Sequence, residues 1–310
     1  MRIPRKLVLG AALLAVGLVL TACASGGDST SSSGTPSSSP KGSITIGVSG
    51  PYAENQLVAE MYAQVLEKAG YTVKRQLDLG AREVSDTALF SGQIDLKPEY
   101  LAFELPKLDA NADTKGTAEQ LFPRVQEAAK AKNLTALQFS PANSTNVFVV
   151  TPETAQANNL STMSSLAPVA CKLVLGAPPD CKTNFACEQG LKEVYGITFK
   201  AIKSLDFGGP QTVAAIESGA VDVGELFSLD PTITTKGWKV LEDDKDLQPA
   251  GNFFPLVRSD KVTDDLTKLL NSVTTKLTTD GMLALVGKVQ VDKEDVKVVA
   301  TQFLKDNGLL

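Results

Sequence analysis

The sequence predicts an α/β fold with two lobes, each a mainly parallel sheet flanked by helices, and a ligand cleft between the lobes. Strand-like and helix-like segments alternate from residue 43 onward, a pattern typical of parallel sheets. A motif also occurs twice: ALFSGQIDLKPEY ends at Tyr100, and AIESGAVDVGELF ends at Phe227. Both copies place an Asp three residues after a Ser-Gly pair and an aromatic residue five residues after that Asp. One copy in each half of the chain indicates two lobes of the same build.

The first half contains three strand-like segments separated by two helix-like ones. The first helix-like segment has apolar residues at helical spacing and ends at Gly70, and the second ends at Gly92. Glycine is common just after a helix because it adopts the left-handed conformation without strain. We expect the third strand to run into a loop at Pro98. In chain order the segments cover residues 43–50, 53–70, 71–80, 82–92 and 93–100.

The second half repeats this alternation, and the C-terminus adds helices. Apolar residues at helical spacing over 262–277 and 294–308 predict two helices that pack back on the first lobe. Before them, the pattern predicts a strand and turn at 146–155, a strand and loop at 173–181, a helix and strand at 189–208, a helix at 209–219 and a strand at 220–227.

These elements divide the chain between the lobes. We expect the first lobe to comprise residues 43–147 plus 253–310, and the second lobe residues 148–252. The chain then crosses between the lobes twice. Two crossings favour a hinge that closes on a ligand.

The N-terminus has the pattern of an export signal. Three basic residues precede an apolar stretch at 7–20, which is too short for a comfortable membrane span. The stretch ends in Leu-Thr-Ala-Cys, which resembles a bacterial lipobox. This predicts a lipoprotein signal peptide over 1–22, with cleavage before Cys23 and lipidation (palmitate) of its thiol; the alternative is a coincidental cysteine in an ordinary signal peptide.

Residues 23–42 predict a flexible linker between the lipid anchor and the folded part. Ser, Gly, Thr and Pro dominate this stretch, so it cannot bury enough apolar surface to order itself. We therefore expect a protein anchored to the cell membrane by lipid at Cys23, with its folded part on the extracytoplasmic face.

Composition excludes several classes of function. The 310 residues include no histidine, which removes histidine-based triads, histidine general bases and histidine-containing zinc sites. The net charge of −5 and the lack of a long basic patch give no case for nucleic acid. No metal site, cofactor or enzymatic activity is expected.

Three cysteines remain after Cys23. Cys181 and Cys187 lie six residues apart in a loop rich in turn-forming residues, and an exported protein folds in an oxidising compartment. We therefore predict a Cys181–Cys187 disulfide and a buried free thiol at Cys171, which lies in an apolar, strand-like run. The sequence leaves open that Cys171 pairs with one of the other two.

The duplicated motif indicates where a ligand would bind. Ligands of open α/β sheets bind outside the carboxyl ends of the strands. Tyr100 and Phe227 stand at the same offset after their strands, so each lobe would present one aromatic ring to the cleft. The alternative is that both rings are hydrophobic plugs in the core.

The chain resembles the substrate-binding lipoproteins of ABC importers for osmoprotectants, such as glycine betaine, choline, carnitine and proline betaine. The resemblance covers nearly all of 44–310, and its cysteine loop is most similar to the actinobacterial branch. It implies a periplasmic-binding-protein-like fold (type II) that closes on its ligand and docks on a permease. The stretches that carry it are ITIGVSGPYAENQLVAEMYAQVLEKAGY, LGAREVSDTALFSGQIDLKPEY, LKEVYGITF, AIESGAVDVGELFSLDPTI and VLEDDKDLQPAGNFFPLVR.

The resemblance implies a box of aromatic rings around a quaternary ammonium group. Such a group has no N–H and is held by ring faces instead of hydrogen bonds. Matching position by position, the family's aromatic residues fall on Tyr52, Tyr100 and Phe227. Phe103 and Asp230 are further candidate ligand contacts.

The sequence also departs from the family pattern. A first-loop lysine of the family falls on Gly50, two further cage tyrosines fall on Asn146 and near Val213, and an arginine that grips the ligand's carboxylate falls near Asn184. We keep Gly50, Asn146 and Asn184 as candidate ligand-binding positions. A carboxylate could instead bind at the helix start near residues 53–54, at Arg82 or at Lys182.

The expected function is an extracytoplasmic, non-enzymatic solute-binding lipoprotein. It would be a monomer that captures a quaternary ammonium compound and delivers it to an ABC permease with its ATPase subunits. One alternative is the same receptor for a non-betaine ligand, such as a polyol or a phenolic compound. Another is a lipoprotein that senses its ligand without delivering it.

Overall fold

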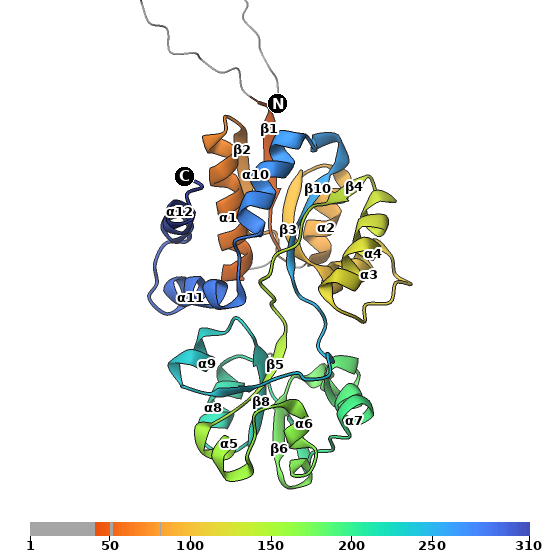
Figure 1. Ribbon diagram of the computed structural model, residues 1–310, viewed down its shortest axis with the longest axis vertical. Helices are drawn as coiled ribbons and strands as arrows, with labels where there is room; N and C mark the ends of the chain where they lie inside the picture. Colours follow the sequence, from red (N-terminus) through yellow and green to blue (C-terminus); the bar gives the residue numbers. More distant parts are fainter. Residues whose placement is uncertain (1–40, 50–51, 81, 207) are drawn as a thin grey trace, which may run out of the picture. The chain divides into compact units, whose positions relative to one another are not determined.

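The computed structural model describes residues 41–49, 52–80, 82–206 and 208–310 (Figure 1). The predicted signal peptide, the lipidation site Cys23, nearly all of the predicted linker and the candidate Gly50 lie outside these residues. No helix in the described part is both long enough and apolar enough to cross a bilayer.

The first lobe is built on a five-stranded sheet in the order β2-β1-β3-β10-β4. β1 runs parallel to β2 and β3, whereas β10 runs antiparallel to β3 and β4. The sheet is mainly parallel, as expected, because β1, β2, β3 and β4 run in one direction. It is mixed because β10, which returns from a distant part of the sequence, runs against the other four strands. The strands are β1 (Ser43–Gly47), β2 (Thr72–Gln76), β3 (Leu96–Tyr100), β4 (Leu134–Ala136) and β10 (Phe253–Arg258).

The second lobe repeats this arrangement in the order β7-β6-β8-β5-β9. β6 runs parallel to β7 and β8, and β5 is the inserted antiparallel strand. β6 and β8 thus correspond to β1 and β3, and the expected lobe boundaries stay a prediction. The strands are β5 (Asn146–Val150), β6 (Val174–Ala177), β7 (Ala201–Ser204), β8 (Val223–Phe227) and β9 (Lys239–Leu241).

Helices cover the sheets, and several follow the expected segments. These are α1 (Ala53–Lys68), α2 (Arg82–Ser91), α7 (Gly190–Tyr195), α8 (Pro210–Glu217), α10 (Asp264–Thr274) and α12 (Val296–Asp306). Six further helices were not expected from the sequence. These are α3 (Leu101–Leu108), α4 (Ala118–Lys130), α5 (Pro152–Asn158), α6 (Met163–Leu166), α9 (Pro231–Thr235) and α11 (Thr279–Gln290). Short helical turns are η1 (Ala170–Lys172), η2 (Pro179–Lys182), η3 (Phe185–Gln189) and η4 (Ser259–Lys261).

Two of these differences have local causes. The expected turn after β5 is the helix α5, because Thr151 caps it through Oγ1, which accepts from Thr154 N at 3.2 Å, and Pro152 fits its first turn. The expected loop at Pro98 is still strand. Pro98 lies opposite Pro255 of β10, and β1 pairs with β3 only at Leu96, so the missing N–H groups break no pairing.

The C-terminal helices pack on α1, as the sequence predicts (Figure 1). Leu266 and Leu270 of α10 and Leu304 of α12 share one buried cluster with Leu57 and Leu66 of α1. The last part of the chain therefore completes the core of the first lobe.

Two segments that cross between the lobes are hydrogen-bonded to each other. Ser144 N donates to Gly251 O at 3.0 Å, and Gly251 N donates to Asn143 Oδ1 at 2.8 Å. A Cβ at residue 251 would overlap the carbonyl oxygen of Ser144, so the close approach requires glycine. The two crossing segments are therefore held side by side by these hydrogen bonds.

Candidate functional site

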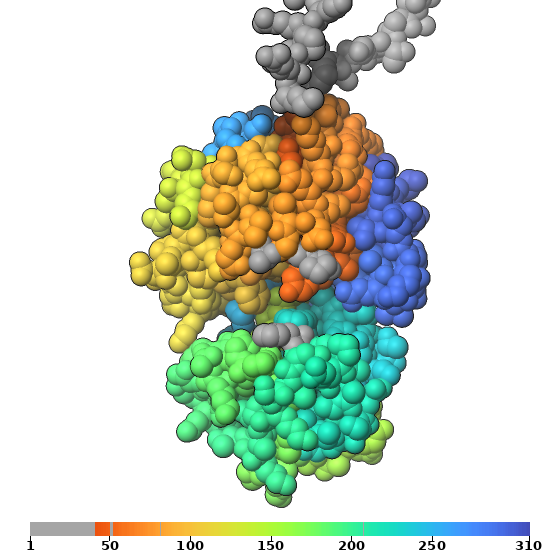
Figure 2. Space-filling view, turned by 180° about the vertical axis from the view of Figure 1, so that it is seen from behind, coloured from red at the N-terminus to blue at the C-terminus, as the bar shows by residue number. Residues whose placement is uncertain are grey.

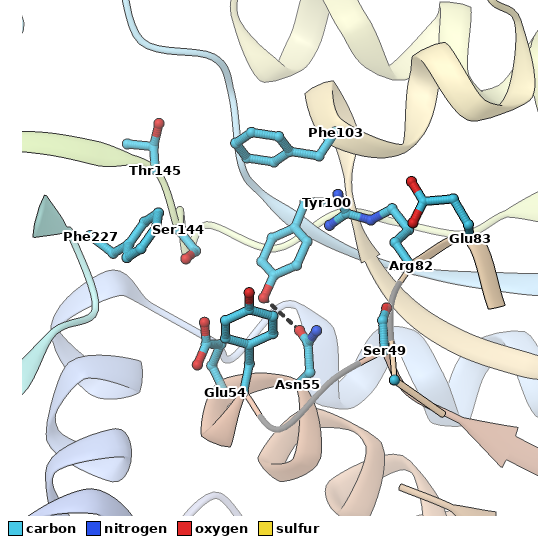
Figure 3. A pocket seen from close by; sticks show the side chains of 12 residues that line it. Ser49, Glu54, Asn55, Arg82, Glu83, Tyr100, Phe103, Ser144, Thr145 and Phe227 are labelled. Carbon is cyan, nitrogen blue, oxygen red and sulfur yellow. Dashed lines mark hydrogen bonds between the residues drawn. The ribbon is translucent and has the colours of Figure 1, made fainter. Parts of the chain in front are cut away.

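A cavity of about 540 Å³ lies between the lobes (Figure 3). Its lining includes Tyr52, Glu54 and Arg82 from the first lobe and Phe227 from the second. We call it the main cavity. Figure 2 shows the surface hollowed between the orange part of the first lobe and the green part of the second.

Both copies of the duplicated motif bring their final aromatic residue to this cavity. Tyr100 is the last residue of β3, and Phe227 is the last residue of β8. Phe227 is 39% exposed, so it is not a core plug. Tyr100 is only 6% exposed, because its ring packs 4.7 Å from the ring of Phe253 and its hydroxyl donates to Asn55 Oδ1 at 2.5 Å. Tyr100 therefore belongs to the core and to the cavity wall at once.

The other predicted residues divide between the main cavity and its neighbours. Tyr52, which is largely exposed, and Phe103 line the main cavity. Asn146 and Asn184 line a smaller cavity beside it. Asp230 lines a third hollow, where its Oδ1 accepts from Thr232 N at 2.8 Å and caps α9.

Arg82 supplies a cation to the main cavity. Its guanidinium carbon lies 5.8 Å from the ring centroids of both Tyr100 and Phe103, and its Nε lies 3.2 Å from Glu99 Oε2. Burial lowers the pKa of Arg82, but Glu99 and Glu104 outweigh it and raise that pKa overall. Of the two side chains considered for a carboxylate, Arg82 lines the cavity and Lys182 is exposed outside its lining.

A buried ionic cluster behind Arg82 holds this arrangement. Lys97 Nζ is fully buried and contacts Asp86, Glu99 Oε1 at 3.0 Å and Glu104 Oε2 at 3.5 Å. Three buried carboxylates close together could suggest a metal site, but the ammonium group of Lys97 already lies among them. Burial and the neighbouring Glu99 raise the pKa of Glu104 well above its usual range. No sequence pattern indicated this cluster, because Lys97 stands in a strand segment and lysine is rarely buried.

Glu54 also faces the main cavity, at the start of α1. Burial raises the pKa of its carboxyl, although backbone and Tyr100 hydrogen bonding oppose the shift. The first lobe thus contributes to the cavity lining aromatic rings, the guanidinium of Arg82 and the carboxyl of Glu54, whose pKa is raised.

A second cavity of about 150 Å³ lies beside the main one, and Phe103 and Phe227 line both. Its polar lining comprises Asn146, Asp180, Asn184 and Glu225. We call it the Glu225 cavity. Burial, followed by the charge of Asp180, raises the pKa of Glu225 to about 7.

The cysteine loop forms one wall of the second lobe's core. Cys181 Sγ and Cys187 Sγ lie 2.02 Å apart in a disulfide. Cys171 is a free thiol, but the expectation that it is buried is wrong. It lies in η1, before β6 begins, so its side chain reaches solvent and not the sheet's core.

The sequence matches a protein family described as "Substrate binding domain of ABC-type glycine betaine transport system" over residues 42–306. The glycine-betaine-binding protein of Pseudomonas aeruginosa PAO1 is 27% identical over 273 residues, 84% of this chain and 86% of that protein. The "Ergothioneine transport permease/ergothioneine binding protein EgtU" of Helicobacter pylori G27 is 26% identical over 262 residues, 84% of this chain. The chain spans about half, 47%, of that second relative.

A solved structure described as "Crystal structure of glycine betaine/carnitine/choline ABC transporter" has the same fold. The TM-score is 0.78 at 24% sequence identity, with 86% of this chain and 99% of that one covered. The two mixed sheets flanked by helices are therefore those of a periplasmic-binding-protein-like fold.

Proposed function

Because this chain belongs to the family of substrate-binding domains of ABC-type glycine betaine transport systems, we propose that it captures a small ligand with a quaternary ammonium group and delivers it to an ABC permease. One observation carries the choice of ligand class. Four aromatic residues, Tyr52, Tyr100, Phe103 and Phe227, line one cavity between the lobes. Ring faces attract a cation that has no hydrogen to donate, by about 0.5–2 kcal/mol each.

Arg82 supports a ligand that also carries an anionic group. Glu99 occupies its Nε, and the remaining N–H groups of the guanidinium can face the cavity. Arg82 also lies near the faces of Tyr100 and Phe103, so Tyr52 and Phe227 are the rings most open to an incoming cation. Glycine betaine, carnitine and ergothioneine, named for relatives of this chain, combine an onium group with a carboxylate and are the first compounds to test.

The proposal also covers the oligomeric state, membrane anchoring and disulfide of the receptor. We propose a non-enzymatic monomer, anchored by lipid at Cys23 on the extracytoplasmic face after removal of its signal peptide, with its Cys181–Cys187 disulfide formed after export. The lobes comprise 43–147 plus 253–310 and 148–252. Support comes from the lipobox-like stretch and from the two separate sheets.

Calorimetric titration of the full-length protein tests the ligand class. We expect micromolar binding of at least one of glycine betaine, choline, carnitine and ergothioneine, and we expect Phe227→Ala to weaken it by roughly 5- to 30-fold. Val240→Ala is the control, because Val240 is an exposed apolar residue of the second lobe outside the cavity. Absence of binding, or binding unchanged by Phe227→Ala, would contradict the proposal.

A polyol or phenolic ligand is the alternative, since Tyr52 in the main cavity and Asn146 and Asn184 in the neighbouring Glu225 cavity can hydrogen-bond hydroxyl groups. Tight binding of such a compound and none of an onium compound would decide for it. Stimulation of the cognate permease in vesicles separates delivery from sensing, because a sensor would bind its ligand without accelerating uptake.

A further inference from the structure

Glu225 is a buried acid that points toward the second cavity. It lies two residues before Phe227 in β8, so the two side chains share one face of the strand. Phe227 pairs with Asn146 of β5, and Asn146 and Glu225 both line the Glu225 cavity. Glu225 is only 5% exposed, and this residual exposure is to the cavity.

No described side chain neutralises this acid. Among residues 41–49, 52–80, 82–206 and 208–310, no Lys or Arg pairs with Glu225 and no N–H or O–H donates to it. Its Oε2 lies 3.1 Å from Cys187 Sγ, but that sulfur is bonded to Cys181 and carries no hydrogen. Asp180 adds a second acid to the same cavity and helps to raise the pKa of Glu225. A buried carboxylate without a donor is costly to maintain.

The neighbouring cysteines do not make a metal site with Glu225. Cys181, Cys187 and Glu225 lie close enough to share an ion. Metals bind cysteine as thiolate, however, and both sulfurs are used by the disulfide. A donor group that enters through the cavity would supply the hydrogen bond that Glu225 lacks among the described residues.

The Glu225 cavity has room for a small polar group and lies next to the proposed binding site. Its volume of about 150 Å³ is well above the ~10–15 Å³ that a single water needs. Phe103 and Phe227 line both cavities, so the two cavities meet at these rings.

We propose that the Glu225 cavity is a second subsite, which receives a hydrogen-bond-donor group of the ligand, above all a protonated amine, while the onium group lies in the main cavity. This inference rests on the proposed function, because the proposed function places the quaternary ammonium group of the same ligand in the main cavity. The ligand would be an extended molecule with an onium group at one end and an N–H donor at the other. Asn146 and Asn184 would complete the contacts around the donor.

A pair of matched probes tests the subsite. Alkyl-trimethylammonium ions of graded chain length are compared with the same ions ending in an amino group in place of the last methyl group. At the best length, we expect the amino-terminated ion to bind the wild type about tenfold tighter or more, as for a hydrogen bond between charged groups. Glu225→Gln should abolish most of this preference and leave the methyl-terminated ion unaffected. Glu188→Gln is the control, because Glu188 is exposed in the same loop and its loss changes the charge equally.

The outcomes separate this inference from the proposed function. If methyl-terminated ions bind but the amino group brings no preference, or a preference that survives Glu225→Gln, the subsite is wrong and the onium site stands. If onium compounds do not bind, butylammonium probes the subsite alone: chemical-shift changes at Asn146 and Glu225 that vanish in Glu225→Gln support it, and their absence overturns it. Circular dichroism and melting temperature verify that both variants fold.

Discussion

The first copy of the duplicated motif, residues 88–100, and the second copy, residues 215–227, place equivalent backbone elements around different side chains. Asp95 and Asp222 make equivalent hydrogen bonds. Asp95 accepts from Thr45 N at 2.9 Å, and Asp222 accepts from Val174 N at 2.8 Å, so each ties its strand to the neighbouring parallel strand. These shared residues build the lobe.

Two residues after each Asp, the copies diverge. Lys97 in the first copy is fully buried among three carboxylates. Its counterpart Gly224 has no room for a side chain, because a Cβ there would overlap Ile216. The next position carries Pro98 in the first lobe and, in the second, Glu225, which has no cationic partner among the described residues. The two copies of the motif therefore share the arrangement of their strands and helices, whereas the side chains near the cavity differ between the lobes.

The largest expected effect is at Lys97. Lys97→Met keeps the length of the side chain but leaves Asp86, Glu99 and Glu104 without their buried cation. We expect a loss of about 3–5 kcal/mol in the free energy of unfolding, measured in urea. Gly224→Ala, the matched change in the second copy, should cost about 1–3 kcal/mol by overpacking. A Lys97→Met protein as stable as the wild type would show that the cluster does not depend on its cation.

The two aromatic residues at the motif ends should separate stability from binding. Tyr100→Ala should lower the free energy of unfolding by about 3 kcal/mol and also weaken ligand binding. Both effects are expected because the Tyr100 ring packs in the core and also lines the main cavity. Phe227→Ala should change the stability of the ligand-free protein by no more than about 0.5 kcal/mol, because the ring is partly exposed. Thermal unfolding without ligand measures this difference. Equal losses in the two variants would make Phe227 a core residue.

Glu225 should make the second lobe sensitive to pH. Its pKa is about 7 in the folded protein against about 4.5 when unfolded, so the folded state holds the proton more tightly. The free energy of unfolding should therefore fall, by about 3 kcal/mol, as pH rises from 4.5 to 7, and this contribution should then level off. Glu225→Gln should remove this part of the pH dependence and stabilise the protein most at pH 8. A variant that follows the wild type at every pH would contradict the raised pKa.

A further difference between the lobes is the disulfide, which among the described residues only the second lobe contains. Replacing Cys181 and Cys187 by alanine should cost about 2 kcal/mol for a loop of this length. Non-reducing peptide mapping should find these two cysteines linked, and the exposed Cys171 should react with iodoacetamide without unfolding. A cross-link that contains Cys171 would exclude this pairing.

Sequence predicted the parts of the fold that depend on local patterns. Gly70 and Gly92 end the first two helices as expected, with φ of 96° and 79°. The duplicated motif also led to Tyr100 and Phe227 at one cavity, because a strand end fixes where its last side chain lies. The mainly parallel sheets were predicted correctly, but the reversed strand in the first sheet was not located. Strand β3 pairs with β10, about 150 residues later, and no local pattern encodes that partner.

The chemistry of the cavity was harder to predict. Arg82 was one of several possible partners for a carboxylate, and only its packing against Tyr100 and Phe103 sets it apart from Lys182. Lys97 and Glu225 look like ordinary polar residues of strands. Their burial results from contacts with α2, α3 and the cysteine loop, which are distant in sequence or were not predicted. Charge inside a protein is a tertiary property, and strand periodicity does not reveal it.

The position of β10 sets an order of events during synthesis. β10 lies between β3 and β4 in the first sheet, yet it follows the whole second lobe in the sequence. The first sheet is not complete until β10 has been synthesised. The C-terminal helices pack on α1 only after residues up to 304 have left the ribosome. The second sheet needs nothing beyond β9, which ends at Leu241. The lobe that begins later in the chain can therefore fold first, and the earlier one waits with its apolar strands exposed.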